Sequence, residues 1–178
     1  RRWVTIAHME LANPEEPAAG PSTEDLRMLT EHATVLADGV ERALGPWVER
    51  CVERVHVERL HRGPPAEVRD AATRAGIEAS EVIGARVRAL LMLDIDDQRT
   101  GPLALLRTAT TYPTRVLLEA GVPTTARDEF LQSQFPEDLY DLGPATFADI
   151  DPALHEPGLI WGAAKAHVHL ARRRAAAN

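Results

Sequence analysis

Apolar residues recur every three or four positions along residues 23–60, which is the spacing of one face of an α-helix. This stripe consists of Leu26, Leu29, Ala33, Leu36, Val40, Leu44, Trp47, Cys51 and Val55. Ser22 and Asp25 stand three residues apart at its start, the arrangement of a helix capping box. The pattern predicts a long helix that begins near Thr23, with a kink or brief break at Gly45-Pro46 because proline removes one helical hydrogen bond.

A second helical region follows the turn "RGPPAEV". Proline in the first turn and Glu67 at the positive end of the helix favour a start there. Gly76 is expected to interrupt this helix, after which a second apolar stripe predicts another. The second stripe contains Ala79, Val82, Ile83, Arg86 or Val87, Leu90 and Leu91. It is the most apolar helical stretch of the chain, so we expect it at the centre of the fold.

Shorter helices are predicted over residues 102–134. The first is expected to break at Tyr112-Pro113, because a residue that precedes proline avoids helical backbone angles. Gly121 is expected to close the next helix. Thr125 with Asp128 is expected to cap a third.

Residues 135–157, here called the wrap, contain four prolines and cannot form one long helix. Loops longer than about 12–15 residues are uncommon in compact domains and are usually either functional or disordered. Seven large apolar residues argue against disorder: Phe135, Leu139, Tyr140, Leu142, Phe147, Ile150 and Leu154. We therefore expect the wrap to cross the helices and to be pinned to them by these side chains.

These elements together predict an all-α fold, a single-domain bundle of about six to eight helices in residues 22–174. Residues 1–21 are expected to be a disordered or cloning-derived lead-in. The stretch "NPEEPAAGPSTED" is rich in proline, glycine and acids, and His8-Met9 matches what a common cloning junction encodes.

Charge and composition narrow the classes of partner. A net charge of −7 with 4% aromatic residues argues against nucleic-acid binding, which needs clustered cations and stacking side chains. No apolar run approaches the roughly 20 residues of a membrane helix. Cys51 is the single cysteine, so no internal disulfide forms, and we expect a reducing cytoplasm.

Eight carboxylates gather in and just before the wrap, with no Lys or Arg between Arg127 and Lys165: Asp128, Glu129, Glu137, Asp138, Asp141, Asp149, Asp151 and Glu156. Such a run is most often a solvated face, and the alternative is a surface for a basic partner or a divalent cation. Asp149, Asp151, His155 and Glu156 are close enough in sequence to share a site of oxygen and imidazole ligands, which suits zinc, manganese or iron. Asp149 and Asp151 could equally cap short turns.

The last helical stretch contains two histidines. Periodicity places His167 on one face with Ile160, Ala163, Ala164 and Ala171, which we expect to be the core side. His169 lies about 200° around the helix from His167, so the two cannot bind one ion. His167 could meet His155 if the wrap folds back, which completes a metal-ligand set of Asp149, Asp151, His155 and His167.

A second acidic cluster, "LDIDDQR", follows the second apolar stripe. Carboxylates are disfavoured at a helix C-terminus, so Asp94 and Asp97 are expected to have compensating partners. Arg99 and Arg107 are the nearest cations, and an Asp-Arg network is the expected arrangement, with a magnesium site as the alternative.

The stretches "DDQRTGPLALLR", "TYPTRVLLEAGVP" and "FPEDLYDLGPATFADIDPALHEPGLIWGAAKAHVHLARRR" resemble those of predicted all-helical proteins from high-GC actinobacteria. The resemblance covers roughly residues 94–174. It implies a bacterial cytoplasmic protein, and it carries over neither an activity nor a role for any residue.

The sequence lacks a glycine-rich phosphate loop, a His-Glu-x-x-His motif and a Gly-x-Ser-x-Gly motif. We therefore expect a non-catalytic binding or protein-interaction module for a protein or small-molecule partner, with no cofactor and with Asp149 to His155 as its working surface. The alternative is an enzyme that uses a divalent metal. A homodimer through an alanine-rich helix face is a further option.

Overall fold

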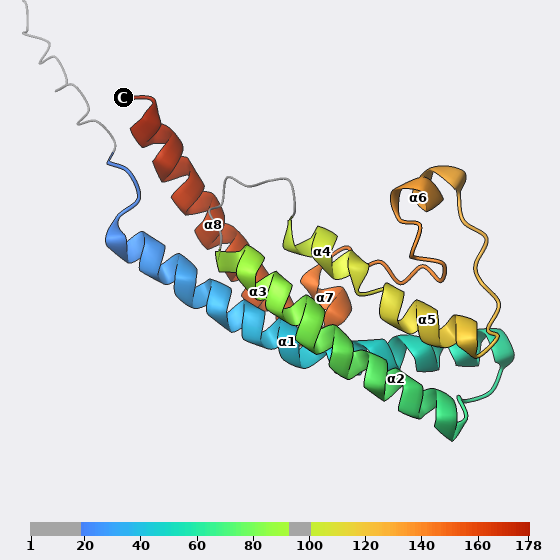
Figure 1. The fold of residues 1–178 in the computed structure, drawn as a ribbon. Helices are drawn as coiled ribbons and strands as arrows, with labels where there is room; N and C mark the ends of the chain where they lie inside the picture. The colour runs from blue at the N-terminus through green and yellow to red at the C-terminus, as the bar shows by residue number, and fades with distance from the viewer. Residues whose placement is uncertain (1–18, 93–100) are drawn as a thin grey trace, which may run out of the picture.

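The computed structural model describes residues 19–92 and 101–178, and every element assigned in these ranges is a helix (Figure 1). The predicted all-α class is therefore confirmed. In chain order the elements are α1 Thr23–Leu60, α2 Ala66–Ala79, the π-helical turn η1 Ser80–Gly84, α3 Ala85–Met92, α4 Pro102–Thr108, α5 Thr111–Glu119, α6 Glu129–Gln134, α7 Phe147–Ile150, the 3-10 turn η2 Pro152–Leu154 and α8 His155–Ala176.

Helix α1 starts where the sequence predicts. The Ser22 hydroxyl accepts a hydrogen bond from the Asp25 backbone N–H (3.1 Å), and the Asp25 carboxylate accepts one from the Ser22 N–H (2.9 Å). The helix then continues for 38 residues with Pro46 inside it. It bends near its middle and does not break (Figure 1), because proline costs one hydrogen bond while the packing on both sides of it persists.

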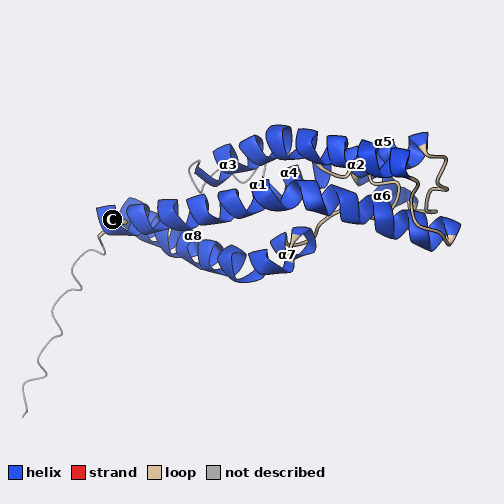
Figure 2. Cartoon of the chain, turned by 90° about the horizontal axis from the view of Figure 1, so that it is seen from below, coloured by secondary structure: helices blue, strands red, loops and turns tan. Residues whose placement is uncertain are grey.

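The centre of the fold is α1, and the prediction that the stretch 79–91 is central was wrong. One side of α1 contacts α2, η1 and α3, and the other side contacts α7 and α8 (Figure 2). A helix between two layers must bury more than one stripe. Accordingly, α1 buries adjacent pairs of residues turn after turn: Leu36 with Ala37, Ala43 with Leu44, Trp47 with Val48, Cys51 with Val52, and Val55 with His56.

Helix α2 crosses α1 at close range. Gly76 does not interrupt α2, contrary to the expectation, but lies buried against Gly45 of α1. A Cβ added to Gly76 would lie 2.8 Å from the Gly45 carbonyl oxygen, so the two backbones approach as closely as glycine allows. The helix then runs through η1, which buries Ile83, into α3, which buries Val87 and Leu91.

The short helices differ from the expectation in their boundaries. The break between α4 and α5 falls at Ala109 and Thr110, and Pro113 lies in the first turn of α5, where its missing N–H leaves no helical hydrogen bond unmade. Gly121 ends α5 as predicted, with a left-handed φ of 69°. Asp128 caps α6 by accepting from the Phe130 N–H (2.8 Å), and Thr125 instead accepts from Arg59 (2.6 Å).

Helix α8 runs antiparallel to the first half of α1. Leu154 at its start packs on Gly39, and Ala175 near its end approaches Gly20. The buried side of α8 consists of Trp161, Ala164 and Val168. The Trp161 ring meets the Phe147 ring edge-on at 6.3 Å, so α7 of the wrap and α8 are packed as a unit on α1. Within the described residues no helix is long and apolar enough to cross a membrane.

Candidate functional site

The wrap crosses the helices as predicted, and most of its apolar residues are buried: Tyr140, Leu142, Phe147, Ile150 and Leu154. Three arginines hold its backbone carbonyl groups. Arg50 donates to Ile150 O (2.6 Å), Arg107 donates to Pro144 O (3.3 Å), and Arg127 donates to the carbonyls of Phe135 and Asp138. Carbonyl groups of an irregular segment need such donors, and with them the wrap becomes a fixed wall against α1.

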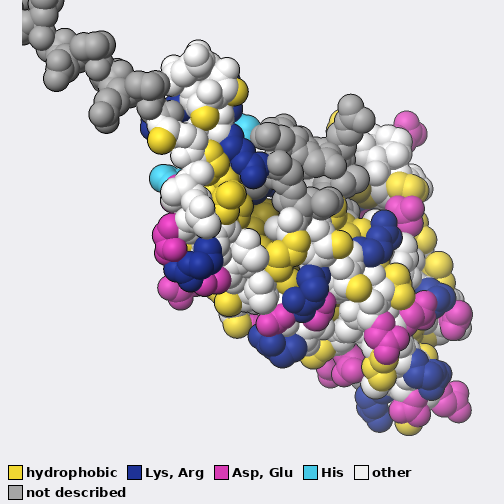
Figure 3. Space-filling model, turned by 60° about the vertical axis from the view of Figure 1, so that its left-hand side comes forward, with side chains coloured by type: hydrophobic (Ala, Val, Ile, Leu, Met, Phe, Trp, Pro, Cys, Tyr) yellow, Lys and Arg dark blue, Asp and Glu magenta, His cyan; other side chains and the backbone are white. Residues whose placement is uncertain are grey.

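Some carboxylates of the acidic run help to hold the wrap in place. Asp138 is buried and accepts hydrogen bonds from the backbone N–H groups of Leu142 and Gly143, while its Oδ2 lies 3.4 Å from Arg127. Asp141 lies 3.2 Å from the same guanidinium group. On the face of the molecule in Figure 3, acidic and basic groups are interspersed, with exposed hydrophobic side chains between them.

Asp149 and Asp151 act as caps, the competing role that the sequence left open. Asp149 Oδ2 accepts from the N–H groups of Ala145 (2.9 Å) and Thr146 (2.7 Å) and from the Thr146 hydroxyl (3.0 Å). These hydrogen bonds, with the Thr146 N–H first, hold the pKa of Asp149 below its usual value. Asp151 accepts from the Ala153 N–H (2.9 Å) at the start of η2.

The predicted metal ligands are not gathered at one point. His155 and His167 both lie on α8, twelve positions apart, which is about 18 Å along the helix axis. His167 is 61% exposed and its Nε2 lies 3.2 Å from Asp25 Oδ1, so the expectation that it faces the core was wrong. In the part of the chain that the structure describes, no group of three or more His, Cys, Asp or Glu side chains could hold a metal ion.

The second acidic cluster lies outside the described residues, so the positions of Asp94, Asp97 and Arg99 are not part of the structure. Their expected partner Arg107 is described. Its guanidinium group lies over the Phe135 ring at 4.3 Å and donates to Pro144 O, so Arg107 holds the wrap.

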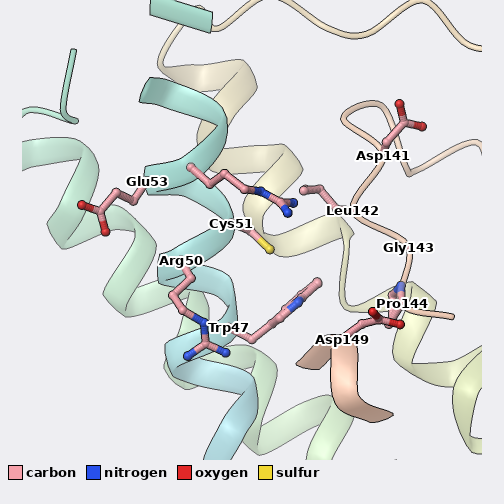
Figure 4. A pocket seen from close by; sticks show the side chains of 10 residues that line it. Trp47, Arg50, Cys51, Glu53, Asp141, Leu142, Gly143, Pro144 and Asp149 are labelled. Atoms are coloured by element: carbon pink, nitrogen blue, oxygen red, sulfur yellow. The ribbon is translucent and has the colours of Figure 1, made fainter. Parts of the chain in front are cut away.

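A pocket of about 510 Å³ lies between α1 and the wrap (Figure 4). One wall is about two turns of α1, from Trp47 to Arg54, and the other is the segment between Asp141 and Asp149. The lining residues are Trp47, Arg50, Cys51, Glu53, Arg54, Asp141, Leu142, Gly143, Pro144 and Asp149.

The floor of the pocket is apolar. Trp47 and Cys51 of α1 point toward the side where Leu142 and Pro144 lie (Figure 4), and all four residues are buried. Burial raises the pKa of the Cys51 thiol to about 12, against the opposing effect of the nearby Arg54 and Arg50. The thiol therefore stays protonated at neutral pH and contributes an apolar surface, as the sequence position on the buried stripe suggests.

The rim of the pocket carries charges of both signs. Arg50 and Arg54 lie one turn apart on α1, and both influence the Cys51 thiol electrostatically. Of the three carboxylates, Asp149 caps α7 and Asp141 pairs with Arg127, while Glu53 points away from the pocket (Figure 4). The arginines are thus the charged groups best placed to meet a ligand.

Sequence reasoning identified Asp149 but missed the α1 side of this site. The available signal was local: Arg50 and Arg54, spaced i and i+4, flank Cys51 on the buried stripe. Nothing in the sequence showed that residues 141–149 would face them.

No family model, curated protein or solved structure matches this chain.

Proposed function

We propose that this protein is a non-catalytic binding protein, and that the pocket between α1 and the wrap receives a small ligand with an apolar body and an anionic group. The observation that carries the proposal is the position of Arg50 and Arg54 beside an apolar floor. Arg54 makes no hydrogen bond or ion pair with any described residue, and Arg50 uses one nitrogen on Ile150 O. Each guanidinium group has five N–H donors, so donors remain for a carboxylate or phosphate.

The dimensions of the pocket support a small ligand. Its volume of about 510 Å³ falls within the range of roughly 300–1,000 Å³ that is typical of small-molecule sites. Such sites combine apolar walls with a few polar groups that fix orientation. Here Trp47 and Leu142 supply apolar contact, and the two arginines supply orientation.

Two pKa shifts favour binding over catalysis. A cysteine nucleophile needs a depressed pKa, and the pKa of Cys51 is raised. A carboxyl group that acts as a general acid near neutral pH needs a raised pKa, and the pKa of Asp149 is lowered. Neither side chain is prepared for proton transfer or attack in this pocket.

The proposed binding surface is the basic side of the pocket, with Arg50 and Arg54, and not the segment from Asp149 to His155 that the sequence suggested. No observation favours the metal-dependent enzyme, and within the described residues no three of its four proposed ligands form a group that could hold a metal ion. Membership in an actinobacterial family and a cytoplasmic location stay predictions from the sequence.

The test is a calorimetric titration with phenyl phosphate as the probe and benzyl alcohol as its neutral counterpart. Phenyl phosphate is expected to bind and benzyl alcohol is not. Arg54→Gln should weaken phenyl phosphate binding roughly tenfold, because it removes a charge-assisted hydrogen bond. Glu53→Gln should leave the affinity unchanged or raise it.

Arg42→Gln is the matched control, since Arg42 is an exposed arginine of the same helix that does not line the pocket. It should bind phenyl phosphate as the unaltered protein does. Equal weakening by Arg42→Gln and Arg54→Gln would show attraction by overall charge alone, and the pocket proposal would then fail.

A further inference from the structure

Helix α8 exposes an apolar row on the side that faces away from α1. Leu159 is 62% exposed and Leu170 is 52% exposed, and Ala163 and Ala166 between them are exposed as well. At 100° per residue this row lies about 180° from the buried row of Trp161, Ala164 and Val168. Helix α8 is thus apolar on two opposite sides, and the core of the described fold uses one of them.

The exposed row has the spacing of a coiled-coil seam. Glu156 precedes it and Arg173 follows it, and the six positions 156, 159, 163, 166, 170 and 173 are separated by alternating steps of three and four. This alternation is the a/d pattern of a heptad repeat, which keeps one face of a helix in contact with a neighbouring helix. Neither Glu156 nor Arg173 makes a hydrogen bond or ion pair with another described residue.

The row is also complementary to itself when one copy is reversed. If two α8 helices pack antiparallel with the axis between positions 163 and 166, Leu159 of one copy faces Leu170 of the other. In the same register Ala163 faces Ala166, and Glu156 faces Arg173. Large apolar residues then meet across the ends, small residues meet at the centre, and opposite charges close both ends of the contact.

We propose that this exposed face of α8 is a self-association surface, on which a second copy of the chain packs its own α8 antiparallel about a two-fold axis. Such an interface is isologous, meaning that both copies contribute the same patch. The central alanines allow the helices to approach closely. A parallel arrangement would instead bring Glu156 against Glu156 and Arg173 against Arg173, so the charges select the antiparallel one.

The supporting side of α8 makes the surface rigid before association. Trp161 packs edge-on against Phe147, and Lys165 lies over the Trp161 ring at 5.1 Å. A face that is already ordered loses little conformational freedom on binding. The contact involves one helix from each copy, so it belongs to the small interfaces of below about 1,200 Å², and association is weak and depends on concentration.

The first test is sedimentation equilibrium of the full chain from micromolar to millimolar concentration. The protein is expected to pass from monomer to dimer over this range, and added salt should weaken the dimer because its end contacts are ionic. Glu156→Arg and Arg173→Glu should each weaken the dimer roughly tenfold, since each variant places like charges opposite one another at both ends. The double variant should recover the dimer, because the charge pairs are restored in the opposite sense.

A matched control comes from another helix. Ile77 of α2 is exposed to a similar degree, at 56%, and does not belong to the row. Ile77→Glu should therefore leave the dimer unchanged, whereas Leu170→Glu should abolish it. A monomer at every concentration, or a double charge variant that associates no better than the single variants, would overturn the proposal.

A second test addresses the register. Ala163→Cys and Ala166→Cys proteins are mixed and oxidised with oxidised glutathione, while the buried Cys51 thiol, whose pKa is raised to about 12, does not compete. The antiparallel register predicts that disulfides between the two variants exceed disulfides within either variant. The reverse result would show a parallel contact and would contradict the proposed arrangement.

Discussion

Helices α2 and α8 both contain several small residues. In α2 these residues face α1, whereas in α8 most of them face away from it. Helix α2 buries Ala72, Ala75, Gly76 and Ala79, and this row packs against α1. Helix α8 buries Ala164 and leaves Gly162, Ala163 and Ala166 exposed. Rows of small residues therefore prepare a helix for close packing, but the presence of a neighbour decides whether the row is buried.

The contact distances show the same contrast. A side chain at Gly76 would meet the backbone of Gly45, whereas a Cβ at Gly162 would have no heavy atom within 4 Å. The α1–α2 crossing is complete within one chain. The exposed side of α8 has room for a second helix, and the proposed dimer supplies one.

The largest expected difference is in the free energy of unfolding, when a buried leucine of α1 and an exposed leucine of α8 are each replaced by alanine. Leu44 of α1 is fully buried, so Leu44→Ala should lower the free energy of unfolding by about 2–5 kcal/mol through lost burial and the cavity left behind. Leu170→Ala should change it by less than about 0.5 kcal/mol in dilute, monomeric protein. Urea denaturation measures both. A large loss for Leu170→Ala would mean that the outer face of α8 is already covered within the monomer.

Glycine-to-alanine substitutions in α2 and α8 should change the stability by smaller amounts and in opposite directions. Gly76→Ala introduces a Cβ 2.8 Å from Gly45 O, and the displacement of two packed backbones should cost about 1–3 kcal/mol. Gly162→Ala meets open space and improves helix propensity, so it should stabilise the monomer by up to about 1 kcal/mol. Thermal unfolding of both variants gives the comparison. If both variants were more stable than the unaltered protein, the backbones at the α1–α2 crossing would be able to move apart at little cost.

The smallest expected effect concerns pH. The α1–α2 crossing is apolar, whereas the start of α1 meets α8 through Asp25 and His167. Hydrogen bonds from the Ser22 backbone, from its hydroxyl and from His167 hold the pKa of Asp25 below its usual value. A depressed folded-state pKa stabilises the fold above the unfolded value of about 3.9 and ceases to do so as pH falls through the folded value.

Asp25→Asn should therefore reduce the loss of stability in acid, and amide exchange measured from neutral to acidic pH should show the change in the start of α1 and in α8. Amides of α2 serve as the internal control and should not respond. A uniform change across all helices would contradict a local origin.

Local signals predicted several features correctly. The capping box at Ser22 and Asp25 fixed the start of α1, and Gly121 ended α5, because both depend on hydrogen bonds and backbone angles within a few residues. The buried row of α1 from Ala33 to Val55 followed from helical periodicity alone. Leu26, the first apolar residue of the predicted stripe, is exposed and lies outside this buried row.

Local sequence signals could not show which face of α8 packs against the core. The row expected to face the core, with Ile160 and His167, and the neighbouring row with Trp161 and Val168 differ by one residue, or about 100° around α8, and both contain large apolar side chains. The structure selects the row with Trp161 and Val168, because Phe147 and α1 lie on that side. His167 consequently turns to the surface and meets Asp25.

The sequence by itself determined that this protein is helical, where α1 begins, and that a proline-rich wrap must cross the helices. These features follow from hydrogen bonds, backbone angles and periodicity over a few turns. Only the tertiary structure decided that α1 is central, that Asp149 is a cap, and that Arg50 and Arg54 share a pocket with residues more than eighty positions away. The reason is that burial and long-range contact depend on which surfaces meet, and a periodic pattern states only which surfaces are available.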